Sequence, residues 1–134
     1  MPYVIGAGLA LSVCMLATFV GFDRDRAFYP TLTIVIASYY ALFAVMGDSM
    51  GALGVESVFM LLFLFASVLG FKLNLWVVVG ALCGHGVFDS LHAHLLANPG
   101  VPVWWPGFCL TYDVTAGGYL ALLLRRSRVA ARHR

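Results

Sequence analysis

The sequence predicts an all-α membrane protein that crosses the bilayer several times. Hydrophobic residues make up 62% of the 134 positions and charged residues only 10%. An ordinary soluble domain carries about 25% charged residues, and a mean hydropathy of +0.93 excludes that class. The apolar, aromatic composition also excludes a disordered chain. By its length the chain forms one domain.

Five hydrophobic stretches come near the ~20 residues that a helix needs to cross a hydrocarbon core of ~30 Å. They cover residues 3–22, 28–47, 55–71, 73–97 and 107–124. Polar segments mark three of the four boundaries: the acidic and basic run 23–26, expected to form exposed ion pairs, the glycine-rich turn 47–54, and Asn98-Pro99-Gly100. The third and fourth stretches merge around residues 70–74. We therefore expect one transmembrane domain over 1–124, followed by a basic tail over 125–134.

Lysine and arginine decide the expected orientation, because cytoplasmic loops are enriched in them. With five spans, Arg24, Arg26, Lys72 and the tail all lie on one side, and the other side receives no Lys or Arg. The sequence thus predicts an N-terminus outside and a cytoplasmic C-terminus, whereas four spans would break this partition. The net charge of +2 comes mostly from the tail, which is typical of membrane-proximal basic charge. No nucleic-acid partner is expected.

Ionisable side chains lie inside the fourth stretch, and they are its most informative feature. His85, Asp89 and His92 are spaced i, i+4 and i+7, which places them within about 60° on one helix face. Each costs roughly 2.5 kcal/mol or more if it faces lipid at the bilayer centre. Asp113 in the fifth stretch and Glu56 in the third fall at similar depth. Antiparallel packing of the last two helices predicts that Asp113 faces Asp89 or His85.

Four interpretations compete for these residues. A metal site is one, because two imidazoles with one or two carboxylates form a common ligand set for zinc, iron or manganese. A proton or ion relay along the helix face is the second. A packing cluster is the third, with His85 bonded to Asp113 or His92 to Glu56. A b-type haem is the last, and it needs a ligand from elsewhere because two histidines on one helix face cannot both bind its iron.

Several sequence blocks look familiar. They are HGVFDSLH at 85–92, NPGVP at 98–102, WWP at 104–106, FC at 108–109, YDV at 112–114 and GFDRDRAFYP at 21–30. Together they resemble a group of uncharacterised small bacterial integral-membrane proteins. The resemblance covers most of the chain and implies a bacterial inner-membrane protein, but it brings no established activity.

The leading hypothesis is a metal-dependent membrane enzyme, most simply a hydrolase, that acts on a lipid or another apolar substrate in the outer leaflet. His85, His92 and Asp113 are the expected ligands, most simply of zinc, with Asp89 as a fourth ligand or a base and Glu56 as an outer candidate. The alternatives are an accessory subunit of a membrane complex and a small proton- or ion-coupled transporter. A homo-oligomer or a partner subunit would help to bury the polar faces.

Overall fold

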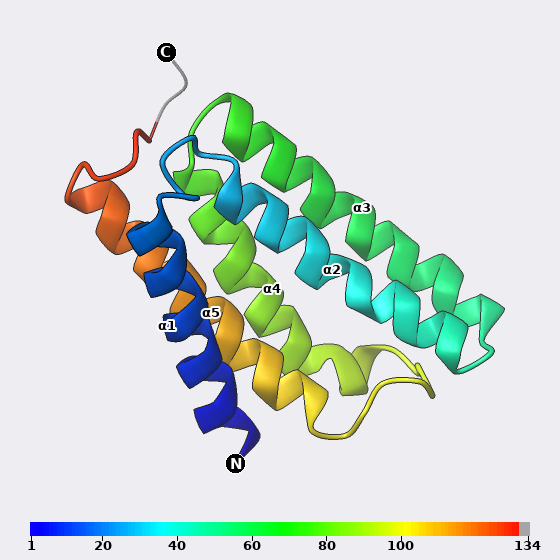
Figure 1. The fold of residues 1–134 in the computed structure, drawn as a ribbon. Helices are drawn as coiled ribbons and strands as arrows, with labels where there is room; N and C mark the ends of the chain where they lie inside the picture. The colour runs from blue at the N-terminus through cyan, green and yellow to red at the C-terminus, as the bar shows by residue number, and fades with distance from the viewer. Residues whose placement is uncertain (132–134) are drawn as a thin grey trace.

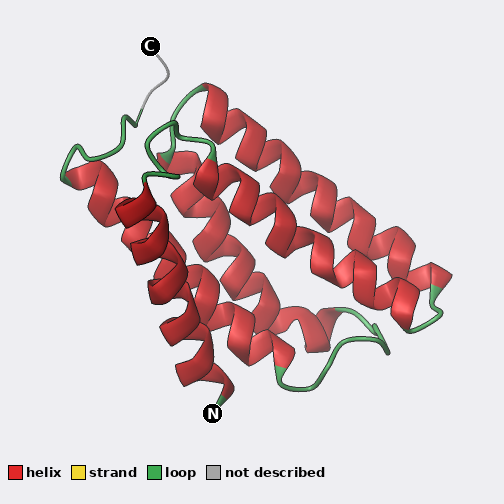
Figure 2. Ribbon diagram, viewed as in Figure 1, coloured by secondary structure: helices red, strands yellow, loops and turns green. Residues whose placement is uncertain are grey.

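The computed structural model describes residues 1–131, and these form five α-helices joined by loops (Figures 1 and 2). The predicted all-α class is therefore confirmed. The helices are α1 (Pro2–Val20), α2 (Phe28–Met46), α3 (Met50–Lys72), α4 (Trp76–Leu95) and α5 (Trp105–Arg125).

The helix ends follow from local residue chemistry. Pro2 stands in the first turn of α1, where its missing N–H costs nothing. Gly21 closes that helix with a φ of 94°, a left-handed conformation that glycine adopts readily. The Ser49 hydroxyl accepts a hydrogen bond from the Ala52 backbone N–H and caps α3. This cap starts α3 earlier than predicted, so the expected glycine-rich turn over 47–54 is in fact a turn of only a few residues.

Four of the five helices, α1, α2, α3 and α5, are long and apolar enough to cross a membrane. The prediction of five such spans is confirmed only to this extent, because α4 is not among them. The difference has a physical reason: α4 carries the buried groups His85, Asp89 and His92 and also the exposed His94. These polar side chains lower the hydropathy of a helix whose 20 residues would still extend about 30 Å.

The helices run alternately up and down, so the two chain ends lie at opposite ends of the bundle (Figure 1). Packing contacts join α4 to α5, α1 to α5, α2 to α3 and, less extensively, α4 to α3 and α2. One end of the bundle, called the basic end below, holds the 21–27 loop, the junction of α3 with α4, and residues 126–131. Every Lys and Arg within residues 1–131 lies at or near this end. The other end, called the loop end, holds residues 47–49 and 96–104.

The basic end is more ordered than the sequence suggested. The Arg26 guanidinium donates hydrogen bonds to the carbonyl oxygens of Ala130 (2.7 Å) and Phe71 (2.8 Å), and burial lowers its pKa. Asp23 is buried and accepts a 2.6 Å hydrogen bond from the Thr18 hydroxyl. The prediction of exposed ion pairs in this turn was therefore wrong. These groups instead tie the turn to neighbouring helices and to residues 126–131.

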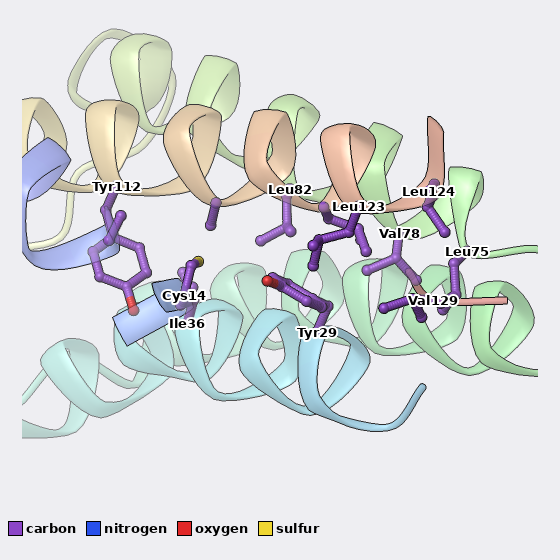
Figure 3. Packing of buried hydrophobic residues seen from close by; sticks show 13 residues of the cluster. Cys14, Tyr29, Ile36, Leu75, Val78, Leu82, Tyr112, Leu123, Leu124 and Val129 are labelled. Atoms are coloured by element: carbon purple, nitrogen blue, oxygen red, sulfur yellow. The ribbon is translucent and has the colours of Figure 1, made fainter. Parts of the chain in front are cut away.

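The apolar core fills the half of the bundle near the basic end (Figure 3). Tyr29 from α2, Leu82 from α4 and Leu120 from α5 are all buried in it, and Val129 closes it from the segment after α5. Close packing of α4 against α5 depends on small residues. A Cβ atom on Gly117 would lie 2.9 Å from the Cys83 sulfur. The core thus holds α4 and α5 in a fixed register, which positions the polar groups nearer the loop end.

Candidate functional site

A cluster of three buried ionisable side chains lies between α4 and α5. The Nδ1 atom of His85 lies 2.7 Å from Asp113 Oδ2 and 3.2 Å from Asp89 Oδ2. His85 and Asp89 are one helical turn apart on α4, and Asp113 faces them from α5. The exposed fraction is 2% for His85 and 0% for both aspartates. We call these residues the His85 cluster.

The His85 cluster contains more carboxylate oxygen than its own hydrogen bonds satisfy. Both oxygens of Asp89 and Oδ1 of Asp113 are buried without a hydrogen-bond partner among the described residues. The Asp89 contact with His85 is therefore an electrostatic approach rather than a well-aligned hydrogen bond. Buried polar atoms are nearly always satisfied, and even a protonated His85 balances only one of two ionised carboxylates. A further proton or a cation would balance the second.

A second pair lies nearer the loop end. His92 Nε2 lies 2.6 Å from Glu56 Oε1, and the two residues are 2% and 1% exposed. The Asn98 amide donates to the same Glu56 oxygen and to the Tyr40 carbonyl oxygen, both at 3.0 Å. Glu56 and His92 thus join α3 to α4, while Asn98 ties the segment after α4 to both α2 and α3.

Aromatic rings enclose both groups. The Phe63 ring packs edge-on against His85 with centroids 4.6 Å apart, and Phe88 lies beside both histidines. The Tyr40 ring stacks on His92 at 4.0 Å with an interplanar angle of 16°. Its buried hydroxyl lies near Asp89 but makes no well-aligned hydrogen bond with residues 1–131. The rings surround both groups with apolar surface, and Tyr40 places a hydroxyl donor beside Asp89.

The structure divides the predicted site residues between the two groups. His85 and Asp113 meet, as antiparallel packing predicted, and Asp89 joins them as the third member. Their ligand atoms lie within 4.8 Å of one another, close enough to hold one metal ion. His92, expected as a ligand, is paired with Glu56 instead. His94 is exposed, because nine residues after His85 it lies on the opposite face of α4.

Sequence reasoning assigned no site role to Tyr40 or Asn98. Asn98 entered only as part of the polar segment that separates the last two stretches. Periodicity could have placed Tyr40 on an inward face of the second stretch, but its contact with His92 depends on how α2 crosses α4. Asn98 lies outside any helix, so spacing arguments could not have found its contact with Glu56.

Comparison of the chain with protein-family models, with curated proteins and with solved structures found no match. A fold by itself does not determine function. The inference about function therefore depends on the geometry and chemistry of the His85 cluster.

Proposed function

We propose that the protein is a metal-dependent integral-membrane enzyme, most simply a hydrolase, that acts on a lipid or another apolar substrate. The observation that carries this proposal is the His85 cluster itself. It places one imidazole and two carboxylates within reach of a single ion, inside a largely apolar bundle, and three of the carboxylate oxygens accept no well-aligned hydrogen bond among the described residues. Burying such groups is costly unless they are paired or bind a metal.

The donor set fits a first-row divalent metal. Imidazole nitrogen and carboxylate oxygen are both ligands of zinc, and mixed sets of this kind also hold iron or manganese. His85, Asp89 and Asp113 would supply the ligands, and a divalent cation would neutralise the excess negative charge. This assignment puts Asp89 in the position expected for His92. Zinc is the simplest choice, because hydrolysis needs no redox change.

Each residue of the site has a role in this proposal. A bound metal would polarise a substrate carbonyl and lower the pKa of a bound water. Asp89 and Asp113 approach His85 from two helices and fix its ring, while Phe63 and Phe88 keep bulk water away. The His92–Glu56 pair is close enough to share a proton and forms the next acid–base pair along α4. Tyr40, between the two groups, offers a hydroxyl donor.

The proposed membrane topology has five spans, with the N-terminus outside and the C-terminus cytoplasmic, in a bacterial inner membrane. Two observations support it. The described Lys and Arg residues gather at one end of the bundle, as the positive-inside rule requires for a cytoplasmic face. The helix α4 packs between α3 and α5 and runs antiparallel to them over 20 residues. In this topology the His85 cluster lies in the outer half of the bilayer.

One observation favours a second candidate, a non-enzymatic subunit in which the polar groups only fix helix packing. Both histidines already contact a carboxylate, His85 with Asp113 and His92 with Glu56. These are the two pairs that a packing role requires. The packing role does not explain, however, why a carboxylate is buried at position 89, because an apolar side chain there would avoid the cost of burying its oxygens.

The test is hydrolysis of a fluorogenic acyl ester by the purified protein in lipid nanodiscs, before and after treatment with a chelator. We expect activity that is lost on chelation, restored by zinc, absent in Asp89→Asn and retained in His94→Gln. Activity that is insensitive to the chelator would overturn the metal assignment. A protein that contains no metal and has no activity would favour the packing subunit.

A further inference from the structure

A groove opens on the bundle between α1 and α2, with α5 as its floor. The helix α1 packs on α5 and α2 packs on α3, while α1 and α2 make few contacts with each other. They share the 21–27 loop and diverge from it towards the loop end (Figure 1). The space between them has a volume of about 210 Å³, and its walls include Leu9, Leu32, Val35 and Trp105.

None of the described residues that line the groove is charged, and the groove faces the bilayer in the proposed topology. Its lining comes from α1, α2 and α5, three of the helices that are apolar and long enough to cross a membrane. Leu9 and Val35 on its rim are 47% and 45% exposed. The surroundings of such an opening are acyl chains, so an apolar occupant enters from the side without crossing water.

The size of the groove decides between a helix and a single acyl chain as its occupant. A helix with side chains is 10–12 Å across and rises 5.4 Å per turn, so one turn fills roughly 420–610 Å³. The lining follows about two turns of α5, over which a helix would need roughly 840–1220 Å³, whereas all the empty space in the groove, including its open side, is about 580 Å³. Its lining on α5 runs from Trp105 to Tyr112, which is about 10 Å along the helix axis. A segment of one alkyl chain fits this narrow space, whereas a second helix does not.

Two features give the groove a polar group for ligand binding and place it near the His85 cluster. The indole N–H of Trp105 is buried and has no acceptor within residues 1–131, although the ring lines the groove. Buried indole N–H groups usually find a partner, and a lipid carbonyl oxygen is a suitable acceptor. Cys109, on the groove floor, lies four residues before Asp113 and so on the same face of α5, one helical turn away. The groove floor is therefore about one turn of α5 from the His85 cluster.

We propose that this groove binds an acyl chain of a membrane lipid ester, with the Trp105 N–H donating a hydrogen bond to the ester carbonyl. The bound ester would lie beside Cys109, next to the His85 cluster. The proposal rests on the proposed function, because it names the substrate class of that site. It treats Trp105 as a residue that positions the ester and not as part of the hydrolytic chemistry.

The experiment uses the full-length protein in nanodiscs that contain a phosphatidylcholine with a photoactivatable diazirine on one acyl chain. After illumination, mass spectrometry locates the lipid adducts, and the metal content is measured in the same samples. We expect adducts concentrated on the groove residues. Val35→Trp should abolish them by filling the groove, and the matched variant Val45→Trp, at an exposed position on the same helix, should leave them unchanged.

Two further variants complete the test. Leu9→Trp should block the groove from its α1 wall. This second variant keeps the test valid if Val35→Trp fails to fold. Trp105→Phe keeps the ring and removes the donor, so the adduct yield should fall roughly 3- to 10-fold, as expected for the loss of one hydrogen bond. Adducts spread over all exposed helix faces, or equal yields in Val35→Trp and Val45→Trp, would overturn the groove proposal. Groove adducts in a metal-free protein would support the groove and contradict the proposed function.

Discussion

Replacing Asp89 by asparagine should stabilise the metal-free protein while it abolishes metal binding. At an effective dielectric constant of 20, two carboxylates no more than 4.8 Å apart repel by about 3.5 kcal/mol or more, and Asp89 at 3.2 Å from a charged His85 gains about 5 kcal/mol. Burial of a carboxylate costs several kcal/mol in addition. The balance favours asparagine by about 1–3 kcal/mol, because its amide N–H can also donate to the unpaired Oδ1 of Asp113.

The assay is thermal unfolding of the detergent-solubilised, chelator-treated protein, followed by circular dichroism. A gain of 1–3 kcal/mol corresponds to an increase in Tm of roughly 3–12 °C for a chain of this size. The control is Asp48→Asn, an exposed aspartate with a φ of 50°, a conformation that asparagine also tolerates. A lower Tm for Asp89→Asn in the metal-free protein would refute the reasoning, since it would mean that Asp89 is already well satisfied.

Two further pairs of substitutions test the burial of the His85 cluster and the packing of the 96–104 segment. His85→Ala leaves two buried carboxylates unpaired and should lower the free energy of unfolding by about 3–5 kcal/mol. The control His94→Ala, at an exposed position, should change it by less than about 0.5 kcal/mol. Equal effects of the two variants in denaturant titrations would contradict the burial described. Gly100→Ala places a Cβ atom against the Phe43 carbonyl oxygen and should destabilise by about 1–3 kcal/mol. Gly51→Ala, in open space on α3, should instead stabilise by about 0.5–1 kcal/mol, and a calorimetric comparison of these two variants checks the docking of the 96–104 segment.

The hydrophobic composition and the positions of turn-forming residues predicted most of the fold. Long apolar stretches fixed the number of helices, and Asn98-Pro99-Gly100 correctly marked the end of α4. The start of α3 was misplaced because a serine cap outweighed the low helix propensity of two nearby glycines. The environment of Arg26 could not be predicted, since its two carbonyl partners lie 45 and 104 residues away in the sequence.

The candidate site was predictable to the extent that helix geometry determines it. His85 and Asp89, spaced i and i+4, share a turn of α4 and face one ion. His92 lies on the same face but about 10 Å further along the axis, too far to join His85 at a single metal. Its pairing with Glu56 depends on the relative depth of α3 and α4, which tertiary packing sets.

The most direct test of the central claim is the metal content of the purified, tag-free protein, measured by inductively coupled plasma mass spectrometry. We expect about one zinc, iron or manganese ion per chain, as a single three-residue site requires. That ion should be lost in Asp89→Asn and Asp113→Asn but not in Asp48→Asn. A native protein that stays free of metal after incubation with zinc, iron and manganese would contradict the account and leave the His85 cluster as a packing element.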